Sequence, residues 1–252
     1  MTAAASLESV VKRFHHVRAV DGISFQVQPG EFVGFIGPNG AGKTTTMRCL
    51  TGQLMPDEGA VHVGGVSVTA DPIGARGRLG YVPQDVELYE YLTGEELLRF
   101  VADVRGVSAA DQTRRVEELL ALTELTSARN RIIREYSGGM ERKIAIAAAL
   151  IARPPLLLLD ESFVGLDPES THALRGHLRE YCEDGGAIIL SSHILDMLER
   201  ICTRVLVLAG GRLVGDLSRE ALDSDPRTLL DIYLELTART SPTHAPSTTG
   251  TT

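Results

Sequence analysis

The sequence has 252 residues, of which 43% are hydrophobic and 23% are charged, and its formal net charge is −8. This composition is typical of a soluble globular protein, and the length allows one or two domains. The negative charge argues against a protein that binds nucleic acid by covering phosphates with Lys and Arg, so no nucleic-acid partner is expected.

Targeting and membrane signals are also absent from the sequence. No stretch approaches the ~20 apolar residues that a membrane-spanning helix requires, so direct membrane insertion is not expected. The N-terminus lacks the charged and apolar regions of a signal peptide. Cys49, Cys182 and Cys202 are widely spaced and form neither a disulfide framework nor a metal-binding knuckle. The sequence therefore predicts a cytoplasmic protein, and any membrane role must come through a partner.

The first third of the chain is dominated by β-type patterns. Short apolar or alternating runs predict strands, and one of them turns at Gly64 and Gly65. The segments expected as strands are 7–13, 19–27, 32–36, 60–68 and 79–82. We expect the first two and the 60–68 pair to form an antiparallel sheet, and 44–50 to form a helix.

Residues 87–154 are expected to form a helical insert. Thr93 begins a capping box ahead of the first helix, and Ser108 begins a second helix with apolar residues at helical spacing. Ser137 opens a third helix, which Pro154 ends.

Strand, crossover helix and strand then recur, which implies a mostly parallel sheet with helices on both faces. The expected elements are strand 156–159, a helix capped by Asp167 and Pro168, strand 187–190, helix 194–201, a hairpin over 205–214 and helix 228–238. We divide the chain into a main α/β domain at 1–220, a C-terminal helical extension at 221–239 and a disordered tail at 240–252.

The first motif that carries chemistry fits G-x-x-x-x-G-K-[ST] and follows an apolar strand. It consists of Gly37, Pro38, Asn39, Gly40, Ala41, Gly42, Lys43, Thr44 and Thr45. Glycines let successive N–H groups form a concave anion nest, and the following helix presents its positive end. Lys43 can reach phosphates, and the Thr44 hydroxyl is a hard oxygen suited to Mg²⁺. The alternative is a glycine-rich turn that matches by accident.

Two further motifs have a chemical interpretation. Asp160 and Glu161 follow a leucine strand at the sheet edge where ligands of open α/β folds bind, so one carboxylate can hold Mg²⁺ and the other can activate water. They can also simply close the strand. Ser137, Gly138 and Gly139 begin a helix with accessible N–H groups, which suits a second anion or an ordinary helix cap.

Together these motifs resemble the ATPase subunit of an ATP-binding cassette (ABC) transporter, a P-loop NTPase with a RecA-like core, an antiparallel β subdomain and a helical subdomain. Tyr136–Met140 is similar to the family's Leu-Ser-Gly-Gly-Gln signature, with Tyr for Leu and Met for Gln. The resemblance covers about residues 6–238. It implies ATP and Mg²⁺ as cofactors.

The resemblance also assigns roles to single residues. Phe14 matches an aromatic residue that stacks on adenine, although core packing is an alternative. Gln84 matches a glutamine that reaches Mg²⁺ and the attacking water, Asp160 a Mg²⁺ ligand and Glu161 the catalytic base. The remaining matches are His193 with the switch histidine and Asp167 with the D-loop. Ser162 and Phe163 depart from the usual Pro-Thr after the catalytic Glu.

For partners, the resemblance implies a head-to-tail homodimer with ATP between one chain's phosphate loop and the other chain's signature, coupled to integral membrane permease subunits. Met140 in the signature and the last helix resemble exporters of drugs, lipids or polysaccharides. The rival functions are a non-transport ABC ATPase and an importer subunit. Apolar residues after Gln84 either receive a permease helix or pack inside the insert; they are Val86, Leu88, Tyr89, Tyr91 and Leu92.

Overall fold

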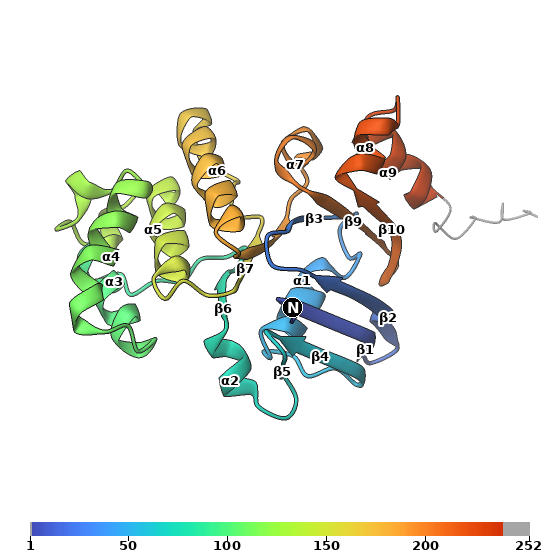
Figure 1. Ribbon diagram of the computed structural model, residues 1–252, viewed down its shortest axis with the longest axis horizontal. Helices are drawn as coiled ribbons and strands as arrows, with labels where there is room; N and C mark the ends of the chain where they lie inside the picture. The colour runs from blue at the N-terminus through green and yellow to red at the C-terminus, as the bar shows by residue number, and fades with distance from the viewer. Residues whose placement is uncertain (1, 239–252) are drawn as a thin grey trace, which may run out of the picture.

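The computed structural model describes residues 2–238 and contains a large sheet with several helices on one face, and the helix Lys43–Leu50 together with a small sheet on the other (Figure 1). The large sheet has the strand order β10-β9-β3-β8-β7-β6. Its strands are β3 (Phe32–Ile36), β6 (Leu79–Val82), β7 (Leu156–Asp160), β8 (Ala187–Ser191), β9 (Arg204–Ala209) and β10 (Arg212–Ser218). All neighbours pair in parallel except β9 and β10, which confirms the predicted mostly parallel sheet.

The small sheet is antiparallel in its order β2-β1-β4-β5, as predicted. Its strands are β1 (Ala5–Phe14), β2 (Val17–Val27), β4 (Glu58–Val63) and β5 (Val66–Ser67). The predicted turn between β4 and β5 is confirmed, because Gly64 and Gly65 both have positive φ angles, which glycine adopts without a steric cost.

Side chains of the large sheet alternate between two hydrophobic clusters. In β7, Leu157 and Leu159 pack among helices, whereas Leu156 and Leu158 pack toward the small sheet. Burial on both faces explains why the parallel strands are continuous apolar runs. The sheet is thereby fixed from both sides, and with it the carboxyl ends of β3 and β7, which are separated in the sheet by β8.

The helices match most of the predicted starts. They are α1 (Lys43–Leu50), α2 (Pro72–Gly77), α3 (Gly94–Val104), α4 (Ala109–Leu122), α5 (Gly138–Leu150), α6 (Pro168–Glu183), α7 (Leu195–Ile201), α8 (Arg219–Ser224) and α9 (Leu229–Ala238). The capping box at Thr93 is confirmed, and Ser108, Ser137 and Asp167 each accept a hydrogen bond from the first turn of their helix. Helices α3, α4 and α5 lie at one end of the molecule (green to yellow-green in Figure 1), and their buried residues share a cluster with the sheet.

The structure differs from the expectations at several boundaries. Helix α5 ends at Leu150, before Pro154, and a turn with Arg153 in the left-handed region follows. Helices α2 and α8 were not predicted, and α8 begins at Arg219. The predicted tail, 240–252, lies outside the described residues. Within residues 2–238 no helix is long and apolar enough to cross a membrane.

Candidate nucleotide site

A cavity of about 660 Å³ opens where β3 and β7 end and α1 begins. Five separate segments of the chain meet there. The predicted site residues that line it are Phe14, Asn39, Gly40, Ala41, Gly42, Lys43, Thr44, Thr45, Gln84, Asp160 and Glu161. The phosphate-loop motif is therefore next to both predicted carboxylates, which are at least 115 residues away in the sequence.

Glycines in the loop are required by close packing as well as by backbone conformation. A Cβ on Gly37 would collide with the carbonyl oxygen of Leu208 in β9, and a Cβ on Gly42 would collide with that of Ala19 in β2. Gly42 also has a φ of +102°, and it immediately precedes α1. The loop is thus wedged between strands of both sheets, with the N-terminus of an eight-residue helix behind it.

Lys43 is held by the loop itself. Its Nζ donates to the carbonyl of Gly37 at 2.6 Å and to the carbonyl of Pro38 at 3.3 Å. Burial lowers the pKa of Lys43, and the nearby carboxylates of Glu161 and Asp160 oppose that shift. A half-buried ammonium whose hydrogen-bond partners are only carbonyls is strongly stabilised when an anionic ligand binds, and a triphosphate is such a ligand.

Asp160 has a free oxygen that suits a cation. Its Oδ1 accepts a hydrogen bond from the hydroxyl of Ser191, whereas its Oδ2 is buried and has no hydrogen-bond partner. Thr44 and Gln84 line the same cavity and add a hydroxyl and an amide oxygen. Hard oxygen donors of this kind, completed by phosphate oxygens, are what Mg²⁺ prefers, so these residues fit the ion.

Glu161 is fixed through its backbone and its side chain. Its φ is +50°, its N–H donates to the Ser191 hydroxyl at 3.0 Å, and its carbonyl accepts from Arg142 at 3.3 Å. Its Oε2 lies 2.9 Å from Nδ1 of His193. A left-handed backbone at a non-glycine residue is disfavoured and is found mainly where the surroundings impose it, often at functional sites. Here it directs a carboxylate to the cavity and to a histidine.

Phe14 lies at the tip of the β1–β2 hairpin and is not a core residue. Its side chain is 42% exposed and lines the cavity, and Lys12 Nζ lies 5.9 Å from its ring centroid. An exposed aromatic face at the mouth of a phosphate site offers a stacking surface for a base.

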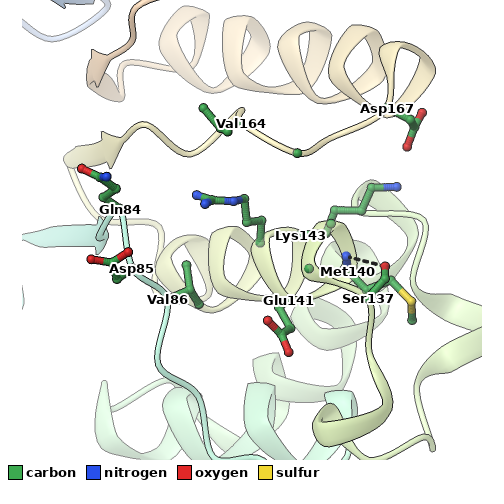
Figure 2. Close-up of a pocket in the computed structure, with 13 residues that line it drawn as sticks. Gln84, Asp85, Val86, Ser137, Met140, Glu141, Lys143, Val164 and Asp167 are labelled. Carbon is green, nitrogen blue, oxygen red and sulfur yellow. Dashed lines mark hydrogen bonds between the residues drawn. The ribbon is translucent and has the colours of Figure 1, made fainter.

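The predicted signature does not lie in this cavity. Ser137, Gly138, Gly139 and Asp167 line a second cavity of about 760 Å³, between the start of α5 and the loop that leads to α6 (Figure 2). Gln84 is the residue that lines both cavities. The Ser137 hydroxyl accepts from the N–H of Met140 at 3.3 Å, while Ser137 and Gly138 are exposed. One chain therefore carries two anion-suited cavities, whose described lining residues have Gln84 alone in common.

Some lining residues of the first cavity had not been predicted from the sequence. They are Val17, Arg18, Ala19 and Gly210. The first three follow Phe14 across the β1–β2 turn. The glycine pair after β9 is tied to the loop by the bond from Gly211 N–H to the Ala41 carbonyl, 3.2 Å long. The signal in the sequence was the short gap between the predicted strands 7–13 and 19–27; the structure shows that residue 17 pairs with residue 14 there.

The fold and this site define a P-loop nucleotide hydrolase with an inserted helical subdomain. The family model described as "ABC transporter" matches residues 20–164. The chain belongs to the ABC transporter family, and it is an ATP-binding and ATP-hydrolysing subunit of that family.

Similar proteins carry related names. The chain is 38% identical to "Nod factor export ATP-binding protein I" of Paraburkholderia xenovorans over 87% of this chain and 72% of that protein. It is 37% identical to the daunorubicin/doxorubicin resistance ATP-binding protein of Streptomyces peucetius over 85% of this chain and 65% of that protein. A solved ATP binding subunit of an ABC transporter has a TM-score of 0.87 at 33% identity, covering 92% of this chain and 99% of that one.

Proposed function

We propose that two copies of this chain bind two ATP molecules between them and that hydrolysis drives export through integral membrane permease subunits. The observation that carries the proposal is the separation of the two cavities within one chain. A second copy arranged head to tail would bring its Ser137–Gly139 end onto the phosphate loop of the first. Two identical chains then supply both halves of each site, so a homodimer suffices.

Several residues that line the two cavities, together with His193, have a proposed part in hydrolysis. Thr44, Asp160 and Gln84 would hold Mg²⁺, which neutralises phosphate charge. Glu161 would accept a proton from the attacking water, and His193 would hold its carboxylate in place. Phe14 would stack on the adenine. From the partner, the backbone N–H groups of Gly138 and Gly139 would bind the terminal phosphate.

The dimer can be tested at Gly138, because a Cβ there meets no atom of its own chain within 4 Å. We expect Gly138→Leu to prevent ATP-dependent dimers in a Glu161→Gln background, measured by light scattering. The matched control is Gly176→Leu, since Gly176 on α6 is also exposed and its Cβ would meet nothing within 4 Å. Dimers that form equally well in both variants would rule out the head-to-tail arrangement.

The membrane partner is proposed to bind beside α3. The patch after Gln84 is divided: Val86, Leu88 and Leu92 pack against the core, whereas Tyr89 and Tyr91 are 61% and 76% exposed. Tyr89 stacks edge-on against Phe100, with ring centroids 5.2 Å apart. Together with Leu88, Glu90, Tyr91 and Leu92 they line a hollow of about 520 Å³. An exposed aromatic hollow suits an apolar helix.

Tyr91→Ala should therefore reduce the amount of chain retained on washed native membranes by about tenfold, as expected for an aromatic hot spot. The purified variant should bind ATP normally, because Tyr91 does not line the cavity that contains the phosphate loop. Ile73→Ala is the control, since Ile73 is 80% exposed on α2, outside this hollow. Equal membrane retention of both variants would contradict the docking site.

The direction of transport rests on the relatives, whose names refer to export and to drug resistance. Through its permease the chain would be held at the inner face of the cell membrane. The transported substrate is selected by the permease subunits in this arrangement.

A further inference from the structure

Glu124, just after α4, has a backbone conformation that its side chain makes costly. Its φ is +58°, in the left-handed region that favours glycine. The preceding helix ends with ordinary capping bonds, including the Glu124 N–H to the Ala121 carbonyl at 3.0 Å, which a glycine would make equally well. Because the backbone of Glu124 is in a disfavoured conformation that the capping bonds alone do not require of a glutamate, we ask which contacts its carboxylate makes.

The Glu124 carboxylate connects two helices that are far apart in the sequence. Its Oε2 lies 2.6 Å from Nζ of Lys143, in the second turn of α5, and 3.0 Å from the hydroxyl of Ser170, in the first turn of α6. Ser170 is only 4% exposed. Lys143 and then Ser170 lower the pKa of Glu124, so the carboxylate stays charged at neutral pH.

Ser170 carries the connection on to Asp167. The one hydrogen of the Ser170 hydroxyl is shared between Glu124 Oε2 and Asp167 Oδ2, the latter 2.6 Å from the hydroxyl oxygen, and the Ser170 N–H donates to Asp167 Oδ1 at 2.9 Å. These two bonds with Ser170 also lower the pKa of Asp167. A chain of polar contacts therefore runs from Lys143 through Glu124 and Ser170 to Asp167. Two residues of this chain of contacts, Lys143 and Asp167, line the second cavity, which also contains the signature residues Ser137–Gly139 (Figure 2).

Helix α5 and the segment from Glu161 to Ser170 are also in contact at other points. A Cβ on Gly139 would come within 3.2 Å of the Gly165 carbonyl, so the backbones are close there. Arg142 donates to the Glu161 carbonyl at 3.3 Å. The start of α5 is thus in contact with the segment from Glu161 to Ser170 over its first two turns, and Glu124 fastens the outer end of that contact.

We propose that Glu124 is a positioning residue that fixes the start of α5 relative to the start of α6, so that Ser137–Gly139 and Asp167 meet a second subunit as one rigid surface. This inference rests on the proposed head-to-tail dimer. Loss of the Glu124 side chain should therefore weaken the association of the subunits. It should leave ATP binding by the single chain unchanged, because Glu124 lies outside the cavity that contains the phosphate loop.

The test uses Glu124→Gly in the Glu161→Gln background. Glycine removes the carboxylate and also relieves the left-handed backbone, so the variant should fold at least as well as its parent. We expect ATP-dependent dimerisation, measured by analytical ultracentrifugation, to weaken about fivefold, within the range for coupled contacts. Arg153→Gly is the control for replacing a charged residue with a left-handed backbone by glycine. Arg153 has a φ of +46° and lines neither the phosphate-loop cavity nor the cavity with Ser137–Gly139.

Two additional variants separate positioning from general damage. Glu124→Gln keeps an oxygen for Lys143 and Ser170 and should restore most of the dimerisation. Lys143→Met should add little to Glu124→Gly, because both break the same contact. Full dimerisation of Glu124→Gly, or additive losses in the double variant, would overturn the inference. If the Glu161→Gln parent itself fails to dimerise with ATP, the proposed function fails instead.

Discussion

Glu161→Gln should lower the rate of ATP hydrolysis by about 10²–10⁴-fold, the usual contribution of a general base, while ATP binding is retained. The amide has nearly the same shape and can still hydrogen-bond His193, whose Nδ1 lies 2.9 Å from Oε2 of Glu161. The backbone contacts of Glu161 with Ser191 and Arg142 do not involve the side chain, so its position is preserved. Only the ability to accept a proton is lost.

Phosphate release under single-turnover conditions is the appropriate measurement, with ATP affinity measured in parallel on the same sample. Glu183→Gln, at the end of α6, is the control for loss of one carboxylate and should hydrolyse at the parent rate. A hydrolysis rate of Glu161→Gln within a few-fold of the parent rate would exclude Glu161 as the base, because loss of a general base typically lowers the rate by about 10²–10⁴-fold.

The strands and the helix starts could be predicted because their signals are local. Leu156–Asp160 is a continuous apolar run ended by a charge, and both faces of β7 are buried. Thr93, Ser137 and Asp167 cap helices through contacts only three residues away, which the sequence displays directly. Pattern and structure agree where such a local cap is followed by an apolar run that is long enough to show its periodicity.

Helices α2 and α8 were missed although each also begins with a local cap. Asp71 and Pro72 form the same cap as Asp167 and Pro168, yet α2 has six residues, two of them glycine, and buries only Ala75. Helix α8 also has six residues and buries only Leu222. Neither is long enough to show an apolar periodicity, so only packing on the sheets reveals them.

The residue types of the candidate site were predictable from the motifs, whereas its division into two cavities was implied by the resemblance to the ABC family and not by the motifs themselves. Spacing along the chain cannot tell that Ser137–Gly139 and the phosphate loop lie on separate walls. Glu124 was beyond prediction for a similar reason: its partners are 19 and 46 residues away, and nothing local distinguishes it from a surface glutamate. Contacts between distant segments decide both features.

Lys43→Ala should weaken ATP binding about 10- to 100-fold, which corresponds to one or two hydrogen bonds to a charged group. In the described structure the Lys43 ammonium is bound by the carbonyls of Gly37 and Pro38, at the wall of the cavity that also holds Thr44 and Asp160. Exchanging neutral carbonyls for phosphate oxygens strengthens both hydrogen bonds, and that gain is what alanine removes.

Equilibrium binding of a fluorescent ATP analogue to the single chain measures this effect without hydrolysis. Arg48→Ala is the matched control, since Arg48 lies in the last turn of the same helix, is exposed, and is absent from the cavity wall. It removes the same formal charge from α1, so any general electrostatic effect of the helix appears in both variants. If Lys43→Ala and Arg48→Ala bind the analogue equally well, the phosphates are not held by Lys43. The loop would then have to bind them through its backbone N–H groups and the helix N-terminus alone.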